Sequence, residues 1–192
     1  GGVAFYDSSV LPVESQVARR GDQIAKCLAA CRKYGVQIHI WKVNWNLGNA
    51  APKEFLLRMR AEKRLQANLQ GKEQLWLCPS DPRNQQLEIA SMVEVARKYE
   101  VDGIHFDYIR YPDADHCFCA GCEKRFQHAS KSTIARWPEE VQRPGPLHQQ
   151  WLQWRRDNIT LVVKSVAEAA HAIKPKLKIS AAVFPRWATD RD

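Results

Sequence analysis

Residues 101–113, VDGIHFDYIRYPD, join an apolar run to side chains that can do chemistry. Side chains alternate between the two faces of a strand, so Ile104 and Phe106 share one face while His105 and Asp107 share the other. Because Asp107 comes last in this run, its carboxylate would stand at the carboxyl end of the strand. The pattern therefore predicts a strand that is apolar toward its helices and ends in the floor of a pocket.

The carboxylate of Asp107 has a catalytic and a structural interpretation. An unpaired carboxylate is costly to bury, so it needs either a function or a partner. Arg110 follows three residues later, and an Asp107–Arg110 ion pair is the structural alternative. His105 either faces the pocket or is a hydrogen-bonded core histidine. We predict that Asp107 is a catalytic carboxylate.

Other predicted strands also end in polar or aromatic residues. In residues 36–45, His39 and Trp41 share one face, and Asn44 and Trp45 stand at or beyond the carboxyl end, although either tryptophan could belong to the core. Asparagine and tryptophan together suit a ligand rich in hydroxyl groups, and tyrosine rings beside a carboxylate can either stack on sugars or pack the loop. We therefore expect a substrate-binding surface that includes Trp41, Asn44, Trp45, Tyr108, Tyr111, Arg186 and Trp187.

A group of cysteines follows the Asp107 segment in the sequence HCFCAGCEKRF. Cys119 and Cys122 have the C-x-x-C spacing, and Cys117 adds a third thiol. A structural zinc site needs four ligands, and the fourth could be Cys78, His116 or His128. A disulfide and free thiols are the alternatives. Zinc here would hold the long loop in place. We expect the reaction at Asp107 to require no cofactor.

Strand-like and helix-like patterns alternate along the chain. The apolar spacing predicts helices over about 14–34, 52–69, 82–99, 120–129 and 148–173, and strands over 3–7, 36–45, 101–107 and 177–184, with a short extended piece at QLWLCPS. Such alternation indicates an α/β protein with a parallel sheet. A dinucleotide-binding fold is less favoured, because no predicted strand is followed by a glycine-rich phosphate turn. A complete (β/α)₈ TIM-type barrel takes about 250 residues. We predict one incomplete barrel domain over 1–192, with a long loop insertion over 108–147.

Composition excludes some partners and leaves others open. The formal net charge is +8, but the basic residues are scattered along helices and mixed with acids, so we expect no nucleic acid partner. No apolar run approaches the roughly 20 residues that a membrane span requires. The chain begins and stops beside predicted strands, so we expect it to be a piece of a longer protein. The oligomeric state stays open.

The chain resembles glycosyl-hydrolase-like family ten, a group of bacterial proteins with a TIM-barrel-type catalytic domain. The resemblance rests on FYDSSVLP, GVQIHIWKVNW, WLCPSDPRNQ and ARKYEVDGIHFDYIRYPD, which occur in the family's order, and on KISAAVFPRW. It implies hydrolysis of O-glycosidic bonds in a polysaccharide or glycan, with Asp107 at the catalytic position, and it implies export from the bacterial cell. The positions that match pocket-lining residues of the family are His39, Asn44, His105 and Arg110.

Two departures from the family pattern bear on the site. Tyr108 stands where the family often has a second acid, and Cys78 stands in place of an aspartate. Glycoside hydrolysis usually needs two carboxyl groups. The second could be Asp7, Asp113 or Asp115, and we favour one beyond residue 192. The glutamates that we expect on helix surfaces instead are Glu88, Glu94, Glu123 and Glu168.

Two other functions remain open from the sequence. One is a carbohydrate-binding barrel of the bacterial envelope that has lost catalysis, which the tyrosine at 108 and the missing second acid favour. The other is a metal-dependent hydrolase that uses His39, His105 and Asp107 as ligands.

Overall fold

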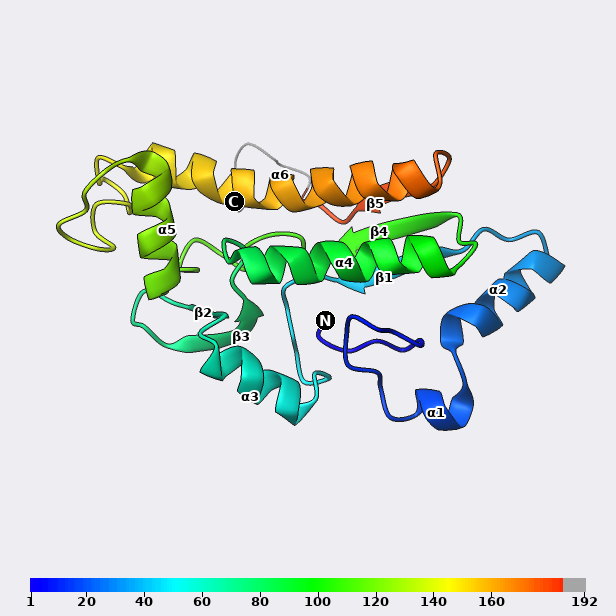
Figure 1. The fold of residues 1–192 in the computed structure, drawn as a ribbon. Helices are drawn as coiled ribbons and strands as arrows, with labels where there is room; N and C mark the ends of the chain where they lie inside the picture. Colours follow the sequence, from blue (N-terminus) through cyan, green and yellow to red (C-terminus); the bar gives the residue numbers. More distant parts are fainter. Residues whose placement is uncertain (185–192) are drawn as a thin grey trace.

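The computed structural model describes residues 1–184 and shows an α/β fold around a parallel sheet (Figure 1). The sheet has three strands in the order β1 (His39–Val43), β4 (Gly103–Asp107) and β5 (Lys178–Ala181). Both neighbouring pairs are parallel, with Trp41 opposite His105 and Val43 opposite Asp107. The predicted strands at 36–45, 101–107 and 177–184 are confirmed, each somewhat shorter than expected. Arg186 and Trp187 lie outside the described residues.

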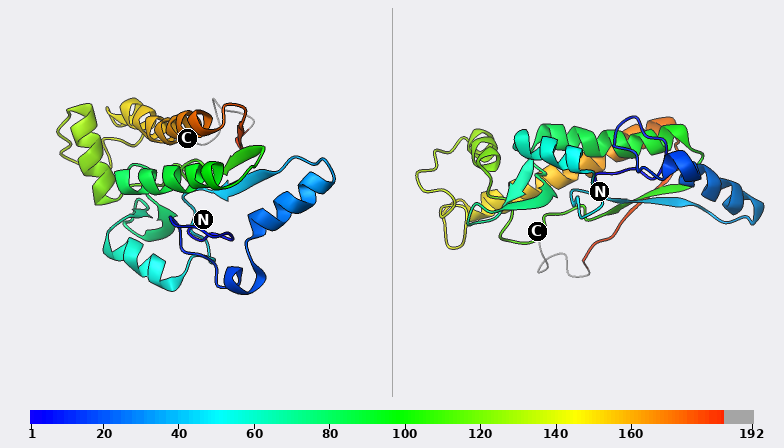
Figure 2. Two further views of the ribbon diagram at one scale, coloured as in Figure 1. Left: turned by 45° about the vertical axis from the view of Figure 1, so that its right-hand side comes forward. Right: turned by 90° about the horizontal axis from the view of Figure 1, so that it is seen from below.

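Two long helices cover one face of this sheet, as Figure 2 shows from below. They are α4 (Pro82–Lys98) and α6 (His148–Ile173), which pack against each other. Helix α4 begins at Asp81, whose side chain accepts a hydrogen bond from the backbone of Arg83 at the amino end of the helix. Ile104 and Phe106 of β4 are 1% and 0% exposed beneath the helices. Burial of these two side chains decides which face of β4 meets the helical layer.

The connection between β1 and α4 differs from its prediction. The helix predicted over 52–69 ends early, as α3 (Lys53–Ala61), and the chain turns at Lys63, which has a positive φ of 54°. The next residues form β2 (Leu65–Ala67), which pairs antiparallel with β3 (Glu73–Leu77). The extended piece at QLWLCPS is therefore a hairpin strand that stands outside the parallel sheet.

The amino-terminal segment also departs from expectation. The strand predicted over 3–7 is wrong, since the structure shows only an isolated bridge between Ala4 and Val13. The helix predicted over 14–34 is divided into α1 (Val17–Arg20) and α2 (Gln23–Lys33). The break falls at Gly21, whose φ of 75° suits glycine, and Asp22 caps α2 by accepting a hydrogen bond from the backbone of Ala25.

The segment 108–147 contains one helix, α5 (Ala120–Ser130), and builds a second hydrophobic cluster with the start of α6. The rings of Phe118 and Phe126 both pack against that of Trp151 at its centre, with centroid separations of 5.6 and 5.1 Å. Figure 1 places α5 at the end of the molecule beyond the sheet. No helix among the described residues is long and apolar enough to cross a bilayer.

Two glutamates expected on a helix surface are buried. Glu88 and Glu94 of α4 are 3% and 6% exposed. Glu94 accepts hydrogen bonds from the hydroxyls of Tyr6, Ser8 and Ser9, at 3.0, 2.6 and 2.7 Å, and from the backbone of Ser9 at 2.6 Å. These bonds tie the amino-terminal segment to α4. Burial acts to raise the pKa of Glu94, but the hydrogen bonds outweigh it and lower that pKa.

We expect Glu94→Gln to reduce the free energy of unfolding by about 1–3 kcal/mol at neutral pH, because the amide cannot accept all four donors. The folded-state pKa is lower than the ordinary 4.5, so this stabilisation is present above that pH and declines as the pH falls through the folded pKa. Urea unfolding of both proteins between pH 7 and about pH 3 measures the difference.

Glu168→Gln is the control, because Glu168 is exposed and its ion pair with Lys164, one turn earlier, is exposed as well. It should change stability by less than about 0.5 kcal/mol. A Glu94→Gln effect as small as this, or one that grows on acidification, would contradict the assignment.

Candidate active site

The face of the sheet that turns away from α4 and α6 carries polar and aromatic side chains. His39 and Trp41 of β1, His105 and Asp107 of β4 and Ser180 of β5 occupy this face by strand alternation. Trp41 is 63% exposed, and His39 and Ser180 are exposed as well. The sheet is thus apolar toward its helices and carries polar and aromatic side chains on its open side.

Asp107 lies at the carboxyl end of β4 and is half-buried. One carboxylate oxygen, Oδ2, accepts a hydrogen bond from Nε1 of Trp41 at 3.0 Å. The other, Oδ1, accepts from the backbone N–H of Tyr108 at 2.8 Å. Two N–H donors, one from β1 and one from the residue that follows β4, therefore orient the carboxylate, which stays partly exposed to solvent.

Arg110 contacts aromatic rings and backbone carbonyls rather than Asp107. Its guanidinium donates to the carbonyls of Tyr111 and Pro112 at 3.2 and 3.1 Å. It also lies over the rings of Tyr108, Phe184 and Trp76, at 5.2, 5.0 and 5.9 Å from their centroids. The ion pair between Asp107 and Arg110 that the spacing allowed does not form. Arg110 and its rings instead make a wall beside the carboxylate.

The two histidines occupy separate positions on the open face. Nδ1 of His105 is hydrogen-bonded to Oγ of Ser180 at 2.8 Å. The His39 ring lies over Gly103, where an added Cβ would stand 2.4 Å from His39 Nδ1, so the absence of a side chain at 103 makes room for the ring. Among the described residues, His39, His105 and Asp107 do not form a group that could hold a metal ion.

Three residues expected to bind substrate are buried instead. Asn44, Trp45 and Tyr111 are all 0% exposed. Asn44 and Trp45 turn inward at the end of β1 to meet α4 and the main core, and Tyr111 packs in the second cluster under the guanidinium of Arg155. Of the predicted substrate-binding residues that the structure describes, those that are not buried are His39, Trp41, His105, Tyr108 and Arg110.

Glu88 organises the carboxyl end of β1 and was missed in the sequence. Its carboxylate accepts hydrogen bonds from Lys42 Nζ at 2.5 Å, Asn44 Nδ2 at 2.6 Å and the backbone of Trp45 at 3.3 Å. The backbone N–H of Asn44 in turn donates to the carbonyl of Asp107 at 2.7 Å. Glu88 lies four residues before the buried Met92, and this helical spacing was the signal that it faces the core.

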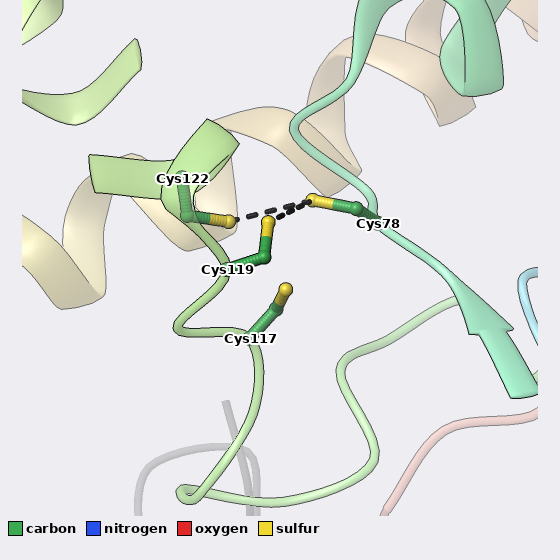
Figure 3. A group of neighbouring side chains, drawn as sticks. All are labelled: Cys78, Cys117, Cys119 and Cys122. Carbon is green, nitrogen blue, oxygen red and sulfur yellow. Dashed lines mark hydrogen bonds between the residues drawn. The ribbon is translucent and has the colours of Figure 1, made fainter. Parts of the chain in front are cut away.

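Four cysteine sulfurs meet between β3 and α5, as Figure 3 shows. Cys78 follows β3 directly, and Cys117, Cys119 and Cys122 come from the loop and the start of α5. All four Sγ atoms lie within 4.8 Å of one another. Of the three residues considered as a fourth member, Cys78 joins the group and His116 and His128 do not.

A family comparison decides what kind of protein carries this sheet and this carboxylate. The model of the family described as glycosyl hydrolase-like 10 matches residues 1–192. The chain belongs to the glycosyl hydrolase-like 10 family. The motif DGIHFDYIRYP, which carries Asp107, lies within the matched region.

Two curated proteins are similar to this member of the glycosyl hydrolase-like 10 family. An S-layer-related protein of Niallia circulans is 22% identical over 191 residues, which are 84% of this chain and 12% of that protein. Glycosyl hydrolase YngK of Bacillus subtilis (strain 168) is 24% identical over 123 residues, which are 62% of this chain and 21% of that protein. The chain thus spans less than a quarter of the length of either relative.

Two solved glycosidase structures share the fold. Alpha-L-fucosidase isoenzyme 2 from Paenibacillus thiaminolyticus superposes with a TM-score of 0.65 at 17% identity, over 94% of this chain and 25% of the fucosidase. A catalytic mutant of Gan42B, a GH42 beta-galactosidase from G. stearothermophilus, superposes with a TM-score of 0.57 at 12% identity, over 86% of this chain and 28% of the galactosidase. At these identities the likeness establishes the fold alone.

We expect Glu88→Ala to cost about 3–5 kcal/mol of unfolding free energy, because it leaves the nearly buried Lys42 ammonium without its partner. The double variant Lys42→Met/Glu88→Leu should recover only part of this loss, since it removes both charges together but still leaves the donors of Asn44 and Trp45 without an acceptor. Chemical denaturation measures both variants. Glu73→Ala, which breaks an exposed pair with Arg60, is the control and should cost at most about 1 kcal/mol. A Glu88→Ala loss no larger than that of the control would contradict this role.

Proposed function

We propose that this chain forms part of the catalytic barrel of a glycoside hydrolase in which Asp107 is one of the two catalytic carboxylates. Family membership and the shared fold of two glycosidases support the class of reaction. The observation that carries the proposal is the placement of Asp107, a solvent-accessible carboxylate oriented by two N–H donors at the carboxyl end of a parallel strand.

The arrangement of the sheet fits an incomplete (β/α)₈ barrel. In such a barrel the helices cover the outside, and the active site is built at the carboxyl ends of the strands. Here α4 and α6 lie on one face, and β1 is an edge strand within the described sheet. A largely apolar cavity of about 740 Å³ lies along β1 and is lined in part by Phe5, Ile24 and Ile40. Further strands of a longer chain would pair with this edge and fill this cavity.

The second carboxylate is supplied from outside the described residues in this proposal. Asp7 pairs with Lys98 at the carboxyl end of α4, which lies at the opposite end of β4 from Asp107. Asp113 is held by Nδ1 of His116 at 2.6 Å, and Glu88 is buried beneath three donors. A partner would have to stand about 5–5.5 Å from Asp107 for retention or roughly 6.5–9.5 Å for inversion.

The surroundings of Asp107 suit a sugar ring. The exposed indole of Trp41 offers an apolar face beside the carboxylate, and its N–H is already directed at Asp107. Tyr108, the residue after Asp107, packs edge to face with Trp76 at a centroid separation of 5.6 Å, and Arg110 lies over the Trp76 ring. Aromatic faces bind the C–H groups of a sugar, while the polar ends of these side chains can reach its hydroxyls.

A carbohydrate-binding protein without catalysis is the second candidate. It is favoured by the state of three candidate acids in the described residues, since Asp7 pairs with Lys98, Asp113 is bonded to His116 and Glu88 is buried. The metal-dependent alternative has less support, because His105 is engaged with Ser180 and the His39 ring lies over Gly103.

We expect Asp107→Asn in the full-length protein to lower kcat on glycosides by about 10³-fold or more while binding of the sugar is kept. The change keeps the shape of the side chain and removes its charge. Release of nitrophenol from a panel of nitrophenyl glycosides measures turnover, and calorimetry with the matching free sugar measures binding. Asp157→Asn on the exposed surface of α6 is the control and should leave both unchanged.

Two results would overturn the catalytic proposal. One is an Asp107→Asn variant with the turnover of the wild type. The other is a wild-type protein that binds glycans and cleaves none of them, which would establish the binding protein instead.

A further inference from the structure

We propose that Cys78, Cys117, Cys119 and Cys122 bind one zinc ion, which fixes the loop after Asp107 to the end of β3. Four cysteine sulfurs are a complete ligand set for structural zinc, and such sites are closed to substrate. The zinc site takes no part in the reaction proposed for Asp107. The zinc proposal therefore stands whether or not the chain hydrolyses glycosides.

The spacing of the sulfurs fits a single tetrahedral ion. With Zn–S bonds of about 2.3 Å, the sulfurs of a tetrahedral site lie about 3.8 Å apart. The Sγ atoms of Cys78 and Cys122 are 3.4 Å apart, those of Cys78 and Cys119 are 3.9 Å apart, and all six separations are within 4.8 Å. A small change in these Sγ–Sγ separations would place all four sulfurs at bonding distance from one zinc ion. A four-iron cluster would need ligand sulfurs spread farther around a cube.

The four cysteines belong to two separate segments of the chain. Cys78 stands immediately after β3, while Cys119 directly precedes α5 and Cys122 lies in its first turn. The carbonyl of Cys119 accepts a hydrogen bond from the backbone of Cys122 at 2.8 Å, which holds the two thiols of the C-x-x-C pair on one side of a tight turn. Figure 3 shows the sulfurs of Cys78, Cys119 and Cys122 directed toward one another.

The surroundings are those of a buried anionic centre. Cys78, Cys117 and Cys122 are at most 1% exposed, within a cluster that includes Phe118 and Phe126. A zinc ion with four thiolates carries a net charge of −2, which needs compensation when it is buried.

Donors surround the sulfurs and can supply this compensation. Nη2 of Arg125 donates to Sγ of Cys78 at 3.4 Å, and its Nε donates to Oγ of Ser80 at 3.0 Å. The Ser80 hydroxyl is itself 3.3 Å from the sulfurs of Cys78 and Cys122. The hydroxyl of Tyr111 is fully buried in the same cluster and has no hydrogen-bond partner in the described part of the chain. Outer donors of this kind orient and stabilise metal-bound thiolates.

A zinc ion would stabilise a region whose hydrophobic cluster is separate from the main core. The segment 108–147 holds a single helix, and small units with a small core commonly depend on a metal or disulfides. On binding, each thiol loses its proton to solvent and forms a bond to Zn²⁺, so the loop becomes linked to β3 without any redox change.

The first experiment measures the metal in the full-length protein purified without added chelator. We expect the wild type to hold about one more equivalent of zinc than Cys78→Ser or Cys122→Ser. Cys27→Ser is the matched control, because Cys27 is an exposed free thiol on α2, and it should keep the zinc of the wild type. Equal zinc in the wild type and both cluster variants would overturn the proposal, and so would bound iron that depends on these cysteines.

The second experiment uses the wild type alone, so it stands even if the variants fail to fold. Co²⁺ exchanged for the native metal should give the intense visible bands and sulfur-to-cobalt charge transfer of tetrahedral thiolate coordination. Alkylation of the native protein followed by mass spectrometry should find four cysteines protected until a chelator is added. A mass lower by two hydrogens with a Cys78–Cys122 linkage would show a disulfide and refute the zinc site.

Removal of the zinc should lower Tm by roughly 5 °C or more, and stoichiometric Zn²⁺ should restore it. Differential scanning calorimetry measures this in the wild type, and Cys27→Ser should respond in the same way. A Tm that is unchanged by complete removal of the metal would contradict a structural role. Because neither activity nor Asp107 enters these measurements, their failure would leave the glycosidase proposal intact.

Discussion

The register between β1 and β4 is the constraint on which the rest of the structure depends. Ile104 and Phe106 must face the helices, and this requirement sends His105 and Asp107 to the open side. A shift by one residue would place a carboxylate beneath α4 and α6, where its desolvation would be severe. The same register brings the indole of Trp41 within reach of Asp107. The geometry of the site thus follows from how the core is packed.

Helix α4 contributes a second constraint through its two buried carboxylates. Glu88 holds the turn at the carboxyl end of β1, and Glu94 holds the amino-terminal segment. Buried charges of this kind add little net stability, because their desolvation offsets most of the attraction. Their donors, however, fit only one arrangement of the backbone. Glu88 therefore fixes where β1 stops. It also holds the end of β4 through Asn44, whose backbone N–H donates a hydrogen bond to the carbonyl of Asp107.

The sequence predicted those parts of the fold that repeat a regular pattern. The strand with Asp107 and the helices α4, α5 and α6 follow from alternation, helical spacing and an aspartate cap. The hairpin of β2 and β3 was not predicted, because its strands are short and their pairing depends on the turn between Asn68 and Lys72 rather than on periodicity. The amino-terminal strand was predicted from apolar residues, but a strand also needs a partner along its length, and Ala4 finds only one bridge.

The sequence predicted the candidate site in part, and the errors in that prediction share one cause. Residue types at a strand end indicate chemistry, yet they do not say whether the chain beyond the strand turns inward. Asn44 and Trp45 turn inward because Glu88 supplies a buried acceptor, which the sequence shows only as one more helix glutamate. The cysteines show the opposite case. Their local spacing predicted three neighbouring thiols, but only the folded hairpin brings Cys78 to them.

The two proposals meet in the short stretch of β3 that precedes Cys78. Trp76 lies two residues before Cys78, and its ring packs against Tyr108, the residue that follows Asp107. The backbone N–H of Tyr108 is one of the two donors that orient the Asp107 carboxylate. Zinc bound at Cys78 would restrict β3, and β3 would in turn restrict the loop at Tyr108. The metal would then act on the reaction only by position, because a closed set of four thiolates leaves it no free coordination site for a substrate.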